Sequence, residues 1–315
     1  MARAISNSKQ IHNIWVHVAA AIAVAAWGLS FINTKVLLDN GFTPVQVYVF
    51  RCVIAYLLLL AFSFKNLLAI NWRHELQFLL CGICGGSLYF VAENAALLYT
   101  SVTNVSLITA TSPLINALLV MMLYKDDKPS RGFVIGSVVA MAGVAMVILG
   151  SSSAEGETAS AAEHGLLGDA LSLLAAVCWS VYAILLRNLQ AFYSAIVVTR
   201  KTFFYGLLTA VPFLLLEPSK ITLATFTLPQ VWINLLVLSV FASSLAFLIW
   251  AWVIRRIGAV KAGNYLYVQP IVTLIFGYLI LQQHTSVISC IGCVVTIVGI
   301  YAGERLSKEQ RRLHH

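Results

Sequence analysis

The sequence predicts an all-helical integral membrane protein with ten transmembrane helices, arranged as two inverted five-helix repeats with both termini in the cytoplasm. Composition is the first observation: 60% of the residues are hydrophobic and only 10% are charged, whereas soluble domains carry about 25% charged residues. Length is the second, since 315 residues fit roughly ten spans of about 20 residues each. The third is that basic residues fall in short segments between apolar runs, as in cytoplasmic loops. A soluble globular enzyme, a disordered chain and a fibrous protein are excluded.

The spans are predicted where apolar runs are bounded by charged residues or by clusters of Gly, Pro and Asn. The first run is too long for a signal-peptide core and has no convincing cleavage pattern before Asn33, so it is kept as a span. In chain order, the predicted spans cover residues 14–37, 43–64, 75–97, 101–124, 131–149, 166–187, 194–216, 230–254, 258–281 and 286–303.

The charges between successive spans support these boundaries and set the orientation. One side carries fifteen basic residues: Arg3, Lys9, Lys65, Arg73, Lys125, Lys128, Arg131, Arg187, Arg255, Arg256, Lys261, Arg305, Lys308, Arg311 and Arg312. The other side carries Lys220 with Asp39, Glu155, Glu157, Glu163 and Glu217. Because basic loops stay inside, both termini are predicted to be cytoplasmic.

The longest connection, residues 150–165, is small, polar and acidic, and predicts a flexible linker on the outer side. It separates an N-terminal repeat, residues 1–149, from a C-terminal repeat, residues 166–303, which is followed by a basic tail, residues 304–315. Each repeat would hold five spans, an odd number. Two copies of one unit joined in this way must have opposite orientations, as in many secondary transporters.

Weak internal similarity supports a repeat. A shift of 157 residues places Pro113 on Pro270, and sets Gly82, Gly86 and Glu93 on Ser239, Ser243 and Trp250. Trp27 precedes Lys35 by the same eight residues that separate Trp179 from Arg187.

Several of these segments resemble EamA-type members of the drug/metabolite transporter superfamily. The similar segments are Trp27-Gly28-Leu29-Ser30-Phe31, Arg51, Glu93-Asn94-Ala95-Ala96-Leu97 with Tyr99-Thr100-Ser101, the span around Pro113, and Trp179. The resemblance extends from about residue 15 to 303 and implies a ten-helix carrier that exports amino acids or other metabolites. The chain departs from the family where a Leu-Gly-Glu turn is common, since it has Lys125-Asp126 and Gln282-Gln283 there.

Five charged residues lie within predicted spans: Lys35, Arg51, Glu93, Arg200 and Lys201. Each would cost about 2.5–3.5 kcal/mol at the centre of a lipid-exposed helix, so they are expected to face protein, water or the interface. One interpretation is structural, with lysines reaching the headgroups and arginines capping or pairing. The other is that Lys35, Arg51 and Glu93 recognise the charge of a solute. Glu93 is also the candidate proton carrier if transport is coupled to protons.

The third predicted span places Gly82, Gly86, Tyr89, Glu93 and Ala96 on one helical face. A face of small residues permits close helix packing or lines a cavity, and the sequence leaves both interpretations open.

Pro113 and Pro270 predict breaks in the fourth and ninth spans. Paired interruptions in two repeats point to a substrate site, although a packing kink is the alternative for either proline alone. The remaining candidates for solute contact are aromatic or amide side chains: Trp27, Tyr89, Trp179, Tyr265, Asn116 and Gln269. For the aromatic residues, core packing or an interfacial belt is the alternative.

These features predict a secondary transporter in a bacterial-type inner membrane that carries a small polar or zwitterionic metabolite by alternating access. The expected partners are the solute, the lipid bilayer and, if transport is coupled, a proton. No metal, cofactor or nucleic acid is expected: the net charge of +8 is spread over loops, and Cys81, Cys84, Cys290 and Cys293 lie in apolar runs. The alternatives are a lipid-modifying enzyme, which would need clustered His, Asp or Cys, and a channel, which would need a filter or a charged ring.

Overall fold

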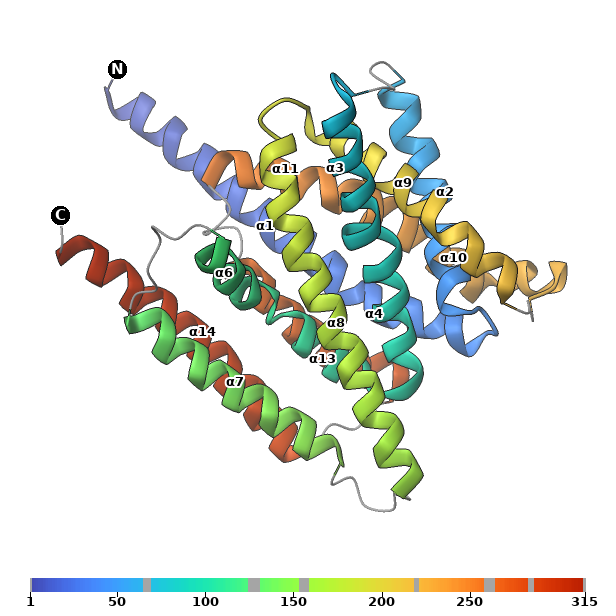
Figure 1. The fold of residues 1–315 in the computed structure, drawn as a ribbon. Coiled ribbons are helices and arrows are strands. Elements are labelled where there is room, and N and C mark those ends of the chain that lie inside the picture. The colour runs from blue at the N-terminus through green and yellow to red at the C-terminus, as the bar shows by residue number, and fades with distance from the viewer. Residues whose placement is uncertain are drawn as a thin grey trace.

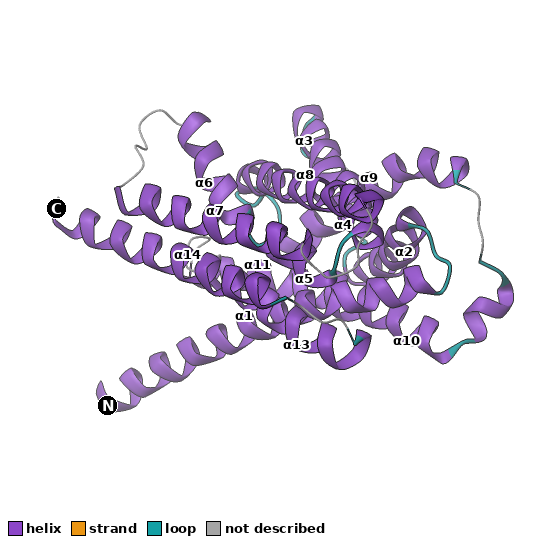
Figure 2. Cartoon of the chain, turned by 90° about the horizontal axis from the view of Figure 1, so that it is seen from below, coloured by secondary structure: helices purple, strands orange, loops and turns teal. Residues whose placement is uncertain are grey.

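The computed structural model describes residues 2–64, 69–123, 131–152, 159–217, 221–257, 264–282 and 286–313. These residues form helices joined by short loops (Figure 2), so the prediction of an all-helical membrane protein is confirmed. Lys125-Asp126, residues 153–158 of the predicted acidic linker and Gln283 lie outside the described residues.

The N-terminal half follows the order α1 (Ala2–Asp39), α2 (Pro44–Phe62), α3 (Trp72–Gly82), η1 (Ile83–Ser87), α4 (Leu88–Tyr99), α5 (Val102–Thr109), α6 (Ser112–Leu123) and α7 (Arg131–Ser152). The C-terminal half follows the order α8 (Ala159–Leu189), α9 (Ala195–Leu216), η2 (Leu223–Thr227), α10 (Pro229–Leu236), η3 (Val237–Leu245), α11 (Ala246–Ile257), η4 (Asn264–Val268), α13 (Gln269–Leu281) and α14 (Val287–Leu313). Helices α7 and α8 extend into the predicted linker from both sides, and α14 continues into the predicted tail.

Five helical stretches among the described residues are long and apolar enough to span a membrane: Ile14–Asp39, Pro44–Phe62, Trp72–Tyr99, Gly165–Leu189 and Pro229–Ile254. Their outer surfaces are apolar, as a lipid-facing surface requires; the exposed side chains include Ile22, Leu57 and Leu173. The third predicted span is a continuous stretch of α3, η1 and α4, whereas the fourth is divided into α5 and α6.

Polar side chains set where several helices begin. The Thr43 hydroxyl accepts a hydrogen bond from the Gln46 backbone N–H, and the Gln46 side chain accepts one from the Thr43 N–H, at 3.2 and 3.0 Å. This capping box satisfies two donors that the first turn of α2 leaves free. Asn71 and Ser101 cap α3 and α5 with one bond each, because their side chains accept from the backbone N–H of His74 and of Asn104.

Two π-helical segments, η1 and η3, were not predicted, and they occupy equivalent positions in the two halves. Moving η1 along the chain by 157 residues places it inside η3. A π-helical turn contains an additional residue, so it changes which face of the helix the following residues occupy. The predicted single stripe is therefore divided: Gly82 and Gly86 pack against α9, whereas Tyr89 and Glu93 line a cavity.

Corresponding helices of the two halves make corresponding contacts, each with the opposite half. Helix α1 packs against η3, α11 and α13 of the second half, and α8 packs against η1, α4, α5 and α6 of the first. Likewise α2 packs against η3 and α9 packs against η1, while α2 and α9 contact each other.

The last helices of the two halves, α7 and α14, run side by side along one edge of the molecule (Figures 1 and 2). Glycines permit their close approach: a Cβ on Gly136 would lie 2.3 Å from the Cα of Gly303. A Cβ on Gly299 would lie 2.6 Å from the backbone nitrogen of Ala140.

Three of the five charged residues within the predicted spans have partners outside the cavity. Lys35 pairs with Asp39 one turn along α1, at 2.9 Å. Lys201 on α9 pairs with Glu75 on α3 at 2.7 Å, and Arg200 donates to the Ser63 hydroxyl at 3.5 Å.

Candidate functional site

A buried cavity of about 40 Å³ lies between the two halves. Helices α1, α2, α4, α5 and α6 of the first half and α8, α11 and α13 of the second contribute to its wall, with the α5–α6 connection and η4. Its lining residues are Trp27, Ser30, Phe31, Arg51, Tyr89, Phe90, Glu93, Thr109, Ala110, Ser112, Trp179, Phe247, Leu266 and Gln269.

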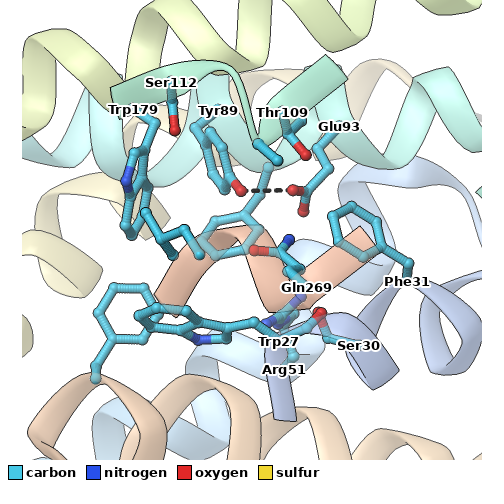
Figure 3. Close-up of a pocket in the computed structure, with 14 residues that line it drawn as sticks. Trp27, Ser30, Phe31, Arg51, Tyr89, Glu93, Thr109, Ser112, Trp179 and Gln269 are labelled. Atoms are coloured by element: carbon cyan, nitrogen blue, oxygen red, sulfur yellow. Dashed lines mark hydrogen bonds between the residues drawn. The ribbon is translucent and has the colours of Figure 1, made fainter. Parts of the chain in front are cut away.

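One side of the cavity carries a buried carboxyl group. Glu93 is 4% exposed, and its Oε1 accepts a hydrogen bond of 2.5 Å from the hydroxyl of Tyr89, one turn earlier on α4. Figure 3 shows Tyr89 and Glu93 above the cavity, with the amide of Gln269 directed into the space below them.

The opposite side carries a buried guanidinium group. Arg51 is 1% exposed; its Nε donates to the Ser243 hydroxyl at 2.9 Å, and its Cζ lies 4.5 Å from the centre of the Phe90 ring. Its Nη1 is buried and makes no hydrogen bond within the described protein. A buried donor without an acceptor is costly, so this nitrogen can bind an anionic group that enters the cavity.

Aromatic rings form a third part of the wall. The Trp27 ring lies edge-on to Trp179, Phe247 and Trp250, with centroid distances of 6.0, 5.4 and 5.2 Å. The Trp27 indole N–H donates to the backbone carbonyl of Ala242 in η3 at 2.9 Å. This bond fixes the ring and joins α1 to the π-helical segment of the other half.

The two interrupted helices bring backbone and polar groups to the cavity. Residues Ala110 and Thr111 separate α5 from α6, with Pro113 the second residue of α6. The 3₁₀ segment η4 precedes α13, in which Pro270 is also the second residue. Hydroxyl groups bond to carbonyls near both interruptions: Ser180 donates to Ser112 O at 2.8 Å, and Thr273 donates to Gln269 O at 3.0 Å.

Six of the predicted contact residues therefore line one cavity: Trp27, Arg51, Tyr89, Glu93, Trp179 and Gln269. Three others do not. Lys35 is held by Asp39 farther along α1, Asn116 is half-buried on α6 one turn beyond Ser112, and Tyr265 hydrogen-bonds to His17.

The structure adds residues that were not selected as contacts. Ser30 lies one turn from Trp27, and Phe90, Phe247 and Leu266 are apolar lining residues. Ser243 holds Arg51 from a position equivalent to Gly86. A small residue in an apolar span gave no sign of this role in the sequence.

Among the described residues, no three His, Cys, Asp or Glu side chains gather as a metal site. The cysteines at positions 81, 84, 290 and 293 are free thiols.

Two regions of the chain, residues 14–149 and 166–302, match the model of the EamA-like transporter family. An uncharacterized transporter of Archaeoglobus fulgidus is 26% identical over 291 residues, covering 92% of this chain and 97% of that protein. The uncharacterized transporter YetK of Bacillus subtilis is 25% identical, covering 90% of this chain and 85% of YetK, and YyaM of the same organism is 28% identical over 72% of each chain. One solved crystal structure has the same fold, with a TM-score of 0.67 and 18% identity over 95% of this chain and 99% of the other.

Proposed function

Because the chain belongs to the EamA-like transporter family, we propose that it is a secondary transporter that exports a small zwitterionic metabolite, such as an amino acid, through the cavity described above. Membership in a transporter family also argues against the alternative of a lipid-modifying enzyme.

The observation that carries the proposal is the placement of a buried guanidinium group and a buried carboxyl group on opposite sides of one cavity. Arg51 presents Nη1 without an acceptor among the described residues, which suits the carboxylate of a solute because charge-assisted hydrogen bonds are strong. Glu93 accepts only from Tyr89 among the described residues and suits an ammonium group. The Trp27 and Trp179 rings would cover the apolar part of the solute, and Gln269 would donate or accept a hydrogen bond.

The cavity also supports alternating access. A water molecule occupies about 10–15 Å³ by the same measure, so a cavity of about 40 Å³ holds a few waters and must widen to admit an amino acid. The corresponding contacts between the halves suit two inverted repeats, residues 1–149 and 166–303, that rock about this cavity. With the basic loops inside, both termini and the tail, residues 304–315, would lie on the cytoplasmic side of a bacterial-type inner membrane.

Counterflow in liposomes tests this proposal. Purified protein would be reconstituted with an unlabelled amino acid inside, and uptake of the labelled amino acid would be followed across a panel of side chains. We expect saturable counterflow of at least one amino acid, and weak or no counterflow of the matching amine without a carboxylate and of the matching acid without an amine. Equal transport of all three compounds would contradict a two-charge site, and flux without counterflow would indicate a channel.

Proton coupling by Glu93 has its own test. Glu93→Gln retains the side-chain shape and removes the exchangeable charge, so transport driven by a pH gradient should be lost. Counterflow at one pH should persist only at higher solute concentrations, because the solute's ammonium group loses its charged partner. A Glu93→Gln protein with normal transport and an unchanged pH response would eliminate Glu93 as the carrier.

A further inference from the structure

A second buried carboxyl group lies outside the cavity, where α8 meets the beginning of α5. Asp169 on α8 is 6% exposed and accepts hydrogen bonds from Thr100 and Asn104. Its Oδ1 is buried and has no hydrogen-bond partner in the described protein. An ionised carboxylate would leave charge on this oxygen without compensation, which is costly, whereas a protonated carboxyl group is neutral and holds a proton at one oxygen. Thr100 and Asn104 favour the ionised form by donating to the carboxyl group, whereas the burial of Oδ1 without a partner favours the acid form.

His17 occupies the equivalent position in the other half. It precedes Trp27 by ten residues, as Asp169 precedes Trp179 by ten residues. The His17 ring hydrogen-bonds to the Tyr265 hydroxyl on η4, with ring centroids 5.9 Å apart. Each first helix thus carries a titratable residue that bonds to the beginning of the interrupted helix in the opposite half.

The two pairs lie toward different ends of the molecule (Figure 1). Ten helical residues span about 15 Å, so each titratable residue lies well outside the ring of Trp27 or Trp179 on its own helix. Helices α1 and α8 begin at opposite ends of the molecule (Figure 1). The segments to which they bond, α5 and η4, lead directly into the cavity residues Thr109 and Gln269.

We propose that Asp169 is a proton-binding site that holds one end of the cavity closed, with the His17–Tyr265 pair closing the other end. The bound proton allows the carboxyl group to remain buried against Thr100 and Asn104. Loss of the proton creates a charge that needs water, and this separates α8 from α5 and opens that end. The inference rests on the proposed carrier function, but not on the identity of the solute.

Besides Asp169, α8 itself carries Glu163, His164, Cys178, Tyr182 and Arg187 as titratable or charged residues. Helices α5 and α6 contain no titratable residue, and Thr100 and Asn104 do not titrate. The other elements packed against α8 carry titratable or charged residues as follows: Tyr89, Glu93 and Tyr99 on α4, Cys84 on η1, Arg73, His74, Glu75 and Cys81 on α3, and Arg131 on α7.

Infrared difference spectroscopy of the purified protein between acidic and alkaline pH tests for the proton. The carbonyl stretch of a protonated carboxylic acid should decrease at alkaline pH in the wild type and in Glu93→Gln. The part of this signal that belongs to Asp169 should be absent in Asp169→Asn. A spectrum of Asp169→Asn identical to that of the wild type would overturn the proposal, whatever the outcome of the transport experiments.

Thiol labelling tests whether the proton controls opening. The experiment uses protein whose native cysteines are replaced. The labelling rate of Ser112→Cys reports access to the cavity, which Ser112 lines. The labelling rate of Ala224→Cys, at an exposed position in η2, corrects for the pH dependence of the reagent. The corrected rate of Ser112→Cys should rise several-fold from acidic to alkaline pH with Asp169 present, and should stay at the acidic value with Asp169→Asn. The same pH response with and without Asp169 would refute the proposal that its proton controls the opening of this end of the cavity. The infrared test retains the native cysteines, so it does not depend on this background.

Discussion

At the scale of single residues, the unpaired nitrogen of Arg51 leads to the clearest prediction. Hydrogen bonds to charged groups contribute about 1.5–3 kcal/mol, so Arg51→Gln should weaken binding of a zwitterionic solute by roughly 10–100-fold. Affinity can be measured from the concentration dependence of thermal stabilisation, because a ligand stabilises the state it binds. Arg256→Gln is the matched control, since Arg256 is exposed on α11. Equal affinity in both variants would argue against a role of Arg51 in binding.

A second residue-scale prediction concerns the indole nitrogen of Trp27. Trp27→Phe retains an aromatic ring but leaves the Ala242 carbonyl without its donor. The expected loss is about 1–3 kcal/mol in the free energy of unfolding. Trp232→Phe, at a half-exposed position on α10, should change stability much less. Denaturant unfolding in detergent gives the free energy of unfolding of both variants. An equal decrease in the two would show that the Trp27–Ala242 hydrogen bond does not contribute specially to stability.

Cavity residues could be predicted best where the side chain is charged, because burying a charge in a membrane costs much free energy. Arg51 and Glu93 stood out because few positions in a membrane helix tolerate a charge. Lys35 stood out for the same reason, yet Asp39 lies one turn farther along α1 and pairs with it locally. Tyr265 is directed away from the cavity by His17, 248 residues earlier in the chain. Partners so distant in sequence leave no periodic signal.

At the scale of helices, the close contact of α9 with α2 and with the end of α3 can be tested with one methyl group. A Cβ on Gly206 would lie 2.1 Å from the Tyr48 hydroxyl oxygen and 3.0 Å from Gly82 O. Overpacking of this kind costs about 1–3 kcal/mol, so Gly206→Ala should lower the melting temperature. Adding Tyr48→Phe removes the atom nearest the methyl group and should restore part of the loss.

The matched control for Gly206→Ala is Gly165→Ala, where nothing lies within 4 Å of the added Cβ. There the substitution should be neutral or slightly stabilising, because alanine favours the helical conformation. If both substitutions lowered the melting temperature equally, the packing argument would be wrong.

Helix positions followed from apolar runs and their polar boundaries, but the internal form of the helices did not. Both predicted prolines lie at the second residue of a helix that begins after an interruption. The π-helical segments have no such marker, since Ile83–Ser87 and Val237–Leu245 consist of small and apolar residues. Their positions depend on packing against α9 and α2 of the opposite halves, which a local pattern cannot contain.

At the scale of the whole molecule, the contacts between halves predict that the covalent connection is dispensable for assembly. Helices α7 and α14 pack together, and α1 and α8 each pack against the other half. Co-expression of residues 1–155 and 156–315 as separate chains should therefore yield a complex that co-purifies and binds solute. The same pair with Gly136→Leu should co-purify poorly, because a Cβ there already meets Gly303. Failure of the unmodified pair to associate would show that the connection is needed.

The division of the molecule into two halves could be predicted from the linker, the odd number of spans and the paired prolines. What could not be predicted is which helix of one half contacts which helix of the other. That arrangement depends on close contacts such as Gly85 against the Tyr182 ring, and neither residue is distinctive in its own span.

The two halves share a scaffold but contribute different chemistry to the cavity, and this has a directional consequence. The position equivalent to Glu93 in the second half is Trp250, which packs on Trp27 with ring centroids 5.2 Å apart, so the carboxyl group has no counterpart in that half. A solute held by Arg51 at one end and Glu93 at the other has one orientation available to it. The solute would then keep the same orientation when it enters the cavity and when it leaves. A compound in which the ammonium and carboxylate groups are exchanged relative to the side chain would be transported poorly.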